Sequence, residues 1–219
     1  KPDFDPNDYK NYPREIQSDR LKCEGAKVDI IFAPSVDEIY GRTGGITFDA
    51  GPASKILCGA SREGHFEGVL QIVSKLFMLI KPQRAYFGQK DAQQLALIEM
   101  LVRDYYFPIQ IVGVPIVRER DGLASSSRNV FLTEKQREEA LLLHETLSTI
   151  RASYKKGENV ETLIATSIQN IHQQTTATVE YLELLNYPNL TRDLQPNQQK
   201  VLAIAVNFPT VRLIDNSIF

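Results

Sequence analysis

The stretch RAYFGQKDAQQLALIEMLVRDYYF, Arg84 to Phe107, decides the fold class. It begins with a short apolar run that stops at Gly88, and an apolar pattern at helical spacing follows from Asp91. A second apolar run, IQIVGVPIV (109–117), comes next. The order strand, helix, strand predicts two parallel strands joined by a helix, as in an α/β domain.

Segments on the N-terminal side extend this pattern. KVDIIFAPS (27–35) is predicted to form a buried strand and ITFDAGP (46–52) a short second one. A short helix is predicted over Glu15–Glu24. A longer one is predicted within SREGHFEGVLQIVSKLFMLIKP (61–82), where apolar residues from Phe66 to Ile80 recur at helical spacing.

The pattern changes after Arg118. A polar loop is followed by Thr133 and Gln136, the spacing of a capping box, which predicts a helix over 134–157. A second helix is predicted around Val160–Gln173, and the strands VEYLELLN (179–186) and KVLAIAVNFPTVRLIDNSI (200–218) end the chain. We therefore expect a domain boundary near Ile116, with a smaller α+β domain of antiparallel strands over residues 117–219.

Composition excludes several classes of function. The 219 residues include 25 basic and 27 acidic side chains, so no basic excess indicates nucleic-acid binding. The apolar runs are too short to span a membrane. Two cysteines make no disulfide framework and fit a reduced, cytoplasmic protein. The three histidines and two cysteines lack metal-ligand spacing, and there is no Walker P-loop and no G-x-G-x-x-G.

The junction after Gly88 has the features of a phosphate site. A glycine at the carboxyl end of a strand lets the backbone approach a ligand, and the first N–H groups of the following helix favour an anion. Lys90 adds a mobile charge, and Gln94, four residues later, lies on the same face of the chain. A turn with a solvated lysine remains the alternative on these residues alone.

Two further clusters favour phosphate binding. SSSRN, Ser125 to Asn129, places hydroxyls and a guanidinium in a loop before a helix, and such groups are common donors to phosphate oxygens. SREGHFEG places Arg62 and His65 in a glycine-flanked loop. A serine-rich linker and a structural histidine are the alternatives. His144 and His172 lie in predicted helices, and we interpret both as structural.

These clusters, in this order, resemble the pantothenate synthetase (pantoate–β-alanine ligase) family. The similarity covers nearly the whole chain. It rests on YPR (12–14), FAPS (32–35), LCGASREGHFEGV (57–69), AYFGQKDAQQL (85–95), IVGVPIVRERDGLASSSRNVFL (111–132), VEYLEL (179–184) and VRLIDN (211–216).

The resemblance implies a Rossmann-like domain over residues 1–116 that binds nucleotide and pantoate, and a lid domain over 117–219. It implies a homodimer that condenses pantoate with β-alanine through a pantoyl adenylate, using ATP and Mg²⁺. It assigns catalysis to Lys90, Ser126, Ser127 and Arg128, the ATP site to Gly88, Gln89, Lys90, Asp91, Val117 and Ser125–Arg128, and substrate contacts to Gln94, His65 and Arg62. Asp19 matches an acidic position of the family's early helix, and a metal-linked role is the hypothesis for it.

Two departures from the family pattern lie at the N-terminal side. The family's His-x-Gly-His motif and its FVNP-x-Q-F segment do not occur in the sequence. We therefore expect the first βαβ portion, at least roughly 30 residues, to be either truncated from the protein or present in it but outside this sequence. A chain that truly lacks it would fold poorly and form no adenylate. Smaller departures are Gln89, Ala92 and Ser125, where the family often has other residues.

Three functions remain open on the sequence. The first is the pantoate–β-alanine ligase reaction. The second is a related adenylate-forming ligase that acts on another small acid. The third is a non-catalytic remnant that binds nucleotide or only self-associates.

Overall fold

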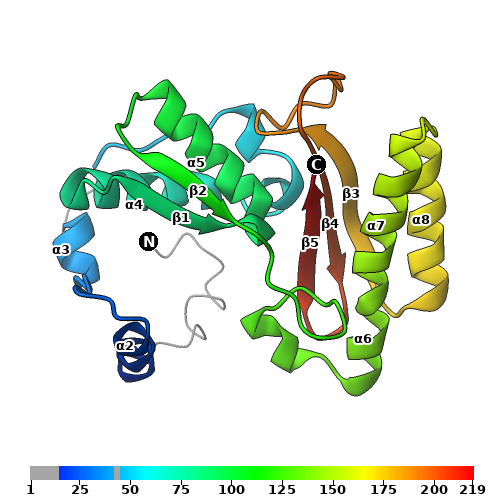
Figure 1. Cartoon of the computed structure of the whole chain (residues 1–219), viewed down its shortest axis with the longest axis horizontal. Helices are drawn as coiled ribbons and strands as arrows, with labels where there is room; N and C mark the ends of the chain where they lie inside the picture. Colours follow the sequence, from blue (N-terminus) through cyan, green and yellow to red (C-terminus); the bar gives the residue numbers. More distant parts are fainter. Residues whose placement is uncertain (1–14, 42–44) are drawn as a thin grey trace.

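The computed structural model describes residues 15–41 and 45–219, so the opening stretch with the YPR motif lies outside the described residues. The chain forms two units side by side (Figure 1). The first unit contains the helices and turns α2 (Ile16–Gly25), α3 (Val36–Tyr40), η1 (Pro52–Ser54), η2 (Leu57–Ala60), α4 (His65–Ile80), η3 (Gln89–Asp91) and α5 (Ala92–Asp104).

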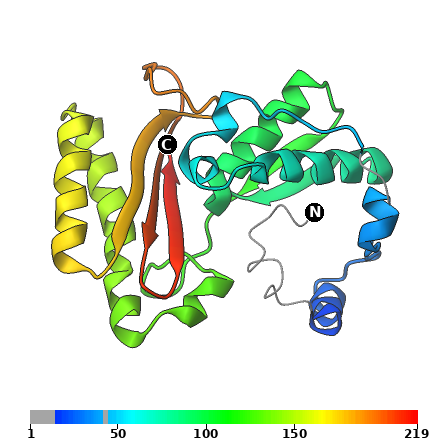
Figure 2. The ribbon, with the colours of Figure 1, turned by 180° about the vertical axis from the view of Figure 1, so that it is seen from behind.

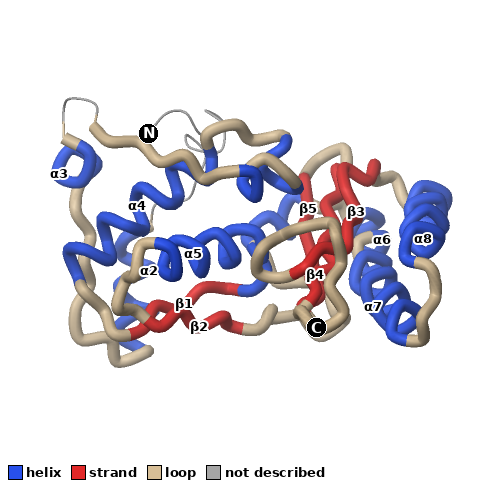
Figure 3. The backbone as a smooth tube through the Cα atoms, turned by 90° about the horizontal axis from the view of Figure 1, so that it is seen from above, coloured by secondary structure: helices blue, strands red, loops and turns tan. Residues whose placement is uncertain are grey.

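The first unit is built on a parallel pair of strands. β1 (Arg84–Gly88) pairs with β2 (Gln110–Val114), and α5 makes the crossover between them. Both α4 and α5 lie on one face of this pair, as the view from above shows (Figure 3). Along β1, Ala85 and Phe87 are half-buried towards the helices, whereas Tyr86 is 62% exposed. The strand–helix–strand prediction and the α/β fold class are confirmed.

The core of the first unit lies between α4 and α5. Phe66, Leu70 and Phe77 of α4 pack against Ile98 and other buried residues of α5. The Phe77 ring also makes edge-to-face contacts with Phe87 and Phe107, with centroids 6.4 and 5.7 Å away. These are the apolar positions that the helical spacing predicted.

Two predicted strands are wrong. Residues 27–35 and 46–52 form no strand, and the side chains of Val28, Ile30, Ile31 and Phe32 are 45–82% exposed. A strand is stable only when a neighbour satisfies its N–H and C=O groups. Among the described residues, the parallel sheet contains β1 and β2 alone, so neither segment has such a neighbour.

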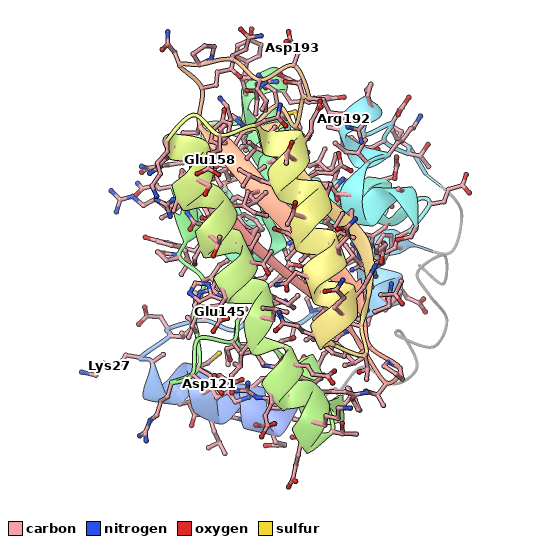
Figure 4. All side chains as sticks on the ribbon, turned by 90° about the vertical axis from the view of Figure 1, so that its right-hand side faces the viewer. Lys27, Asp121, Glu145, Glu158, Arg192 and Asp193 are labelled. Atoms are coloured by element: carbon pink, nitrogen blue, oxygen red, sulfur yellow. The ribbon has the colours of Figure 1, made fainter. Side chains whose placement is uncertain are left out.

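The second unit is an antiparallel sheet covered by helices. β3 (Thr178–Asn186), β4 (Lys200–Asn207) and β5 (Arg212–Ile218) lie in the order β3-β4-β5. Figure 4 shows α7 (Leu141–Lys155) and α8 (Val160–Gln174) side by side in front of this sheet. The turn η4 (Ser127–Phe131) and α6 (Glu134–Glu139) lead into α7.

The single helix predicted over 134–157 is divided in two. The capping box that predicts its start is present, since Thr133 Oγ1 accepts from the Gln136 N–H at 3.3 Å and Gln136 Oε1 accepts from the Thr133 N–H at 3.0 Å. α6 has six residues and ends at Glu139. Ala140 is both the C-cap residue of α6 and the N-cap residue of α7. Ala140 is fully buried in the core of the second unit, so the break packs against the sheet.

The central strand β4 faces both units. Leu202 and Ile204 point towards α7 and α8, while Val201 and Ala203 share a second cluster with residues of α5. This alternation follows from the two-residue period of a strand. Figure 2 shows the segment of η1 and η2 between the units, where Cys58 Sγ lies 3.1 Å from Tyr181 Oη. The boundary near Ile116 falls in the connection after β2 and stays a prediction.

Within residues 15–41 and 45–219, no helix combines the length and apolar character needed to cross a membrane. The described cysteines, Cys23 and Cys58, are both free thiols.

Candidate functional site

The carboxyl end of β1 presents a backbone turn that carries Lys90. Gly88 ends the strand, η3 follows, and α5 begins at Ala92. Asp91 is the N-cap residue of α5, but its side chain makes no capping hydrogen bond. The first N–H groups of α5 therefore keep their capacity to bind an anion.

Asn216 of β5 holds this turn from the second unit. Its side-chain Nδ2 donates to the carbonyl oxygens of Gln89 and Lys90, both at 2.9 Å. Asn216 is only 3% exposed, so these bonds are shielded from water. The position of Lys90 is thereby tied to the last strand of the chain.

A buried ion pair supports Asn216. Arg118 donates through both terminal nitrogens to the Asp215 carboxylate, at 2.7 and 2.9 Å. Asp215 is 3% exposed, and its Oδ1 also accepts from the Asn216 N–H at 2.7 Å. Arg118 further donates to the Gly122 carbonyl at 3.0 Å. The pair therefore joins β5 to the loop that leads to Ser125.

The serine cluster is ordered by short-range bonds. Ser126 caps η4, and its Oγ accepts from the Arg128 N–H at 3.2 Å. Asn129 Nδ2 donates to the Ala124 carbonyl at 3.1 Å and to Glu119 Oε1 at 2.7 Å. The bond from Asn129, followed by that from Arg137, holds the pKa of Glu119 below its ordinary value.

Arg137 of α6 joins the same loop. It reaches Glu119 at 2.7 Å and Asp121 at 2.6 Å. Its hydrogen bond is the main reason that the pKa of Asp121 lies below its ordinary value. Both carboxylates are therefore charged at neutral pH and hold the loop against α6.

Lys90 and Ser126, from distant parts of the sequence, line one small hollow. Its volume is about 10 Å³, and Asn129 and Asp215 also line it. Ser125, Ser127 and Arg128 are exposed beside it, and the side chain of Val117 is 69% exposed. The structure thus brings together the two clusters that the sequence had indicated, one from each unit.

Arg62 and His65 lie on a third segment: Arg62 is in the loop between η2 and α4, and His65 is the first residue of α4. A Cβ at Gly59 would lie 1.7 Å from the Ser54 carbonyl oxygen, so only glycine fits this turn. Ser61 Oγ donates to Glu180 at 2.8 Å, and Glu180 pairs with Arg212 at 2.7 Å. Arg62 and His65 are half-buried, and neither lines the hollow of Lys90 and Ser126.

The two adjacent glutamines of α5 have different environments. Gln93 is 5% exposed, and its Nε2 donates to the carbonyls of Ala53 and Ile56 at 2.8 and 2.7 Å. Gln93 therefore has a structural role, because it ties α5 to the segment of η1 and η2. Gln94 is half-buried, and its amide makes no hydrogen bond to another described residue. Its amide is therefore available to a ligand.

The described residues contain no group of three or more His, Cys, Asp or Glu side chains that could hold a metal ion. Asp19 is exposed on α2, with Oδ1 3.6 Å from Lys22 Nζ.

Sequence reasoning gave no role to Arg118, Asp215 or Asn216. Their signal was present in VRLIDN, where an aspartate follows an apolar run in a strand. A charged group in such a position needs a partner. The partner, however, could not be chosen among the many arginines of the chain.

Comparison with known proteins identifies the family. The family model described as pantoate-beta-alanine ligase matches residues 3–218. The chain belongs to this family. Its curated relatives include the pantothenate synthetases of Lysinibacillus sphaericus, 52% identical over 99% of this chain and 76% of that protein, and of Bacillus subtilis, 43% identical over 98% and 76%. The chain is thus a member of an enzyme family of ATP-dependent ligases.

Solved structures of the family have the same fold. Pantothenate synthetase from Thermus thermophilus superposes with a TM-score of 0.87 at 39% identity, covering 98% of this chain and 79% of that one. The enzyme from Francisella tularensis gives a TM-score of 0.76 at 31% identity, covering 98% and 74%. That structure was solved in complex with β-γ ATP and β-alanine.

Proposed function

We propose that the protein activates D-pantoate with ATP and joins it to β-alanine through a pantoyl adenylate. One observation carries this proposal: Lys90 and Ser126 line the same hollow at the carboxyl end of β1. Ligands of α/β sheets bind at that edge. The complex of the Francisella tularensis relative with an ATP analogue and β-alanine supports the assignment of substrates.

The first step places charge on the transferring phosphates. A pantoate carboxylate oxygen attacks the α-phosphorus of MgATP, and the bond to the bridging oxygen of pyrophosphate breaks. Lys90, the hydroxyls of Ser126 and Ser127, and Arg128 donate to the oxygens on which negative charge grows. The backbone of Gly88–Asp91 with Val117 and Ser125 lines the nucleotide site.

The second step uses the adenylate as a leaving group. The β-alanine amine, once deprotonated, attacks the acyl carbon, and AMP leaves with the bonding electrons to give the amide pantothenate. Gln94 holds the pantoate moiety through its amide, and Arg62 and His65 border the acid. Residues 1–116 carry both substrates, and residues 117–219 cover them. A homodimer is expected, which sedimentation would test.

The test is pantoate-dependent exchange of labelled pyrophosphate into ATP. We expect exchange with D-pantoate alone and pantothenate formation once β-alanine is added. Exchange supported by another small hydroxy acid but not by pantoate would establish a related ligase instead. ATP binding without exchange, in protein shown to be folded by circular dichroism, would establish a non-catalytic nucleotide binder.

A further inference from the structure

A second cavity lies apart from the hollow of Lys90 and Ser126. Its volume is about 540 Å³, and it is lined by residues of α7, β5 and the connection after β2. Figure 1 shows this connection beside β5. Cavities of roughly 300–1,000 Å³ commonly bind small molecules. Neither Ser126 nor Arg128 lines it, whereas Gln89 does, so it adjoins the proposed reaction site without including the serine–arginine cluster.

The cavity is lined by basic side chains. His144, Arg151 and Lys155 lie along one face of α7, because they are seven and four residues apart. None of the lining side chains is a carboxylate. Arg151 and Lys155 form no ion pair with any residue in the described ranges, so their charges are not compensated.

Contacts with β5 and the chain end hold these cations at the cavity. The Phe219 ring lies under both, with its centroid 5.1 Å from Arg151 Cζ and 5.5 Å from Lys155 Nζ. Arg151 Nη1 also donates to Ser217 Oγ at 3.3 Å. Both charges therefore stay beside the cavity. Their side chains lose less conformational entropy when a ligand binds than mobile surface side chains would lose.

Neutral donors and apolar surface complete the lining. Phe219 and Lys200 form a hydrogen-bonded pair, in which each N–H donates to the carbonyl of the other. In an antiparallel ladder such pairs alternate with pairs that are not hydrogen-bonded, so the N–H of Ile218, opposite Val201, points away from β4. β5 is an edge strand within the described sheet, so this N–H has no partner strand there, and Ile218 is one of the lining residues. The side chains of Ile116 and Leu147 provide an apolar wall.

We propose that this cavity binds a small organic phosphate. The phosphoryl group lies against Arg151 and Lys155, because uncompensated cations with neighbouring N–H donors favour a dianion. The organic body lies over Ile116 and Leu147. Gln89 and Asn216 also line the cavity, so the ligand would contact the turn that carries Lys90 and the residue that holds this turn. The proposal does not depend on the reaction catalysed.

Phenyl phosphate is a suitable probe, because it has an apolar body and a dianion and is neither reactant nor product of the proposed reaction. We expect isothermal titration calorimetry at low salt to show one binding event. The double variant Arg151→Gln with Lys155→Gln should weaken it at least about tenfold, by loss of two charge-assisted bonds. Lys90→Ala, which changes a residue outside the cavity, should leave the binding event unchanged.

A matched pair of variants distinguishes specific binding in the cavity from general electrostatic attraction of the anion to the protein. Ser148 and Thr149 are adjacent and exposed on α7, but only Ser148 lines the cavity. Ser148→Glu should abolish binding, whereas Thr149→Glu, with the same net charge, should retain it. Equal weakening by both, unchanged affinity in the glutamine double variant, or no binding by the unmodified protein would each overturn the proposal.

Discussion

The side-chain amide of Asn216 donates to the carbonyl oxygens of Gln89 and Lys90, each at 2.9 Å. This joins the last strand of the chain to the turn at the end of β1. Arg118 and Asp215 form a bidentate ion pair, and the Asp215 carboxylate also accepts a hydrogen bond from the Asn216 N–H. The geometry of the candidate phosphate site therefore depends on Asp215 and Asn216, which are more than a hundred positions away from Lys90 in the sequence.

Asn216→Ala should therefore impair activity as well as stability. Two half-buried carbonyl oxygens lose their donor, which costs up to about 1–3 kcal/mol for each group left unsatisfied. We expect kcat/KM for ATP to fall at least about tenfold, because Lys90 is no longer fixed. Steady-state kinetics and urea unfolding measure the two effects.

Asn207→Ala is the matched control for this variant. Asn207 lies at the end of β4, is exposed, and donates to Glu180 at 3.3 Å. We expect a small loss of stability and normal kinetics. If Asn216→Ala also kept normal kinetics at a reduced stability, Asn216 would be a packing residue without a positioning role.

Lys90→Ala tests the central cation directly. Lys90 is half-buried and forms no ion pair among the described residues, so its removal should leave the fold intact. We expect adenylate formation, measured by pyrophosphate exchange, to fall at least about tenfold. Lys156→Ala, which removes an exposed charge at the end of α7, should have no effect. An unchanged exchange rate for Lys90→Ala would remove Lys90 from the mechanism.

Local patterns predicted the elements that have their own cores. The spacing of Phe66, Leu70 and Ile98 gave α4 and α5, and the capping box at Thr133 gave the start of α6. The run at 27–35 has the composition of a strand but adopts none. Strand formation depends on a paired neighbour, which an apolar run cannot specify by itself.

The site was predictable only in part, for a similar reason. Lys90 and Ser126 occur in motifs whose residue types indicate phosphate, so sequence could select them. Asn216 acts on two backbone carbonyls, and a carbonyl has no sequence signature. Contacts of this kind are set by how β5 lies against the end of β1, which is a property of the packed fold.

Gln94→Ala should weaken pantoate far more than ATP. The amide of Gln94 is half-buried one turn beyond Lys90 and makes no hydrogen bond to another described residue. Loss of a ligand hydrogen bond typically costs about 0.5–1.5 kcal/mol, or a few-fold to tenfold in KM for pantoate. Gln93→Ala, by contrast, should destabilise the fold. Equal weakening of both substrates by Gln94→Ala would indicate a packing role.

Glu180 should make the stability of the protein depend on pH. The hydrogen bond from Arg212 is the main cause that lowers the pKa of Glu180, with a further bond from Ser61. A carboxylate with a lowered folded pKa stabilises above its unfolded pKa of about 4.3, and this stability is lost as pH falls through the folded value. Glu180→Gln should therefore cost about 1–2 kcal/mol at pH 7, after allowance for solvent screening.

The difference between wild type and Glu180→Gln should shrink as the pH falls below 4, in urea unfolding at a series of pH values. Glu183→Gln is the control, because its partner Arg192 has a side chain that is 67% exposed. Its effect should stay within about 0.5 kcal/mol at all pH values. A Glu180→Gln deficit that persists unchanged at pH 3 would contradict the assigned charge.

The hydrophobic cluster shared by β4 and α5 should make the two units unfold together. Leu185 is fully buried in this cluster beside Leu95 and Ala96. Leu185→Ala should lower the free energy of unfolding by about 2–5 kcal/mol. Hydrogen exchange followed by mass spectrometry should show that the free energy of exchange falls by the same amount for the slowest amides of α5 and of β4.

Ile171→Ala decides whether this coupling is general. Ile171 is fully buried in the cluster between the helices and the sheet of the second unit, away from α5. If the units unfold together, this variant should also speed exchange in α5. The free energy of exchange of the slowest α5 amides should then fall by as much as the free energy of unfolding. Faster exchange confined to residues 117–219 would instead show that this unit is an independent domain, free to move as a lid over the Lys90 turn.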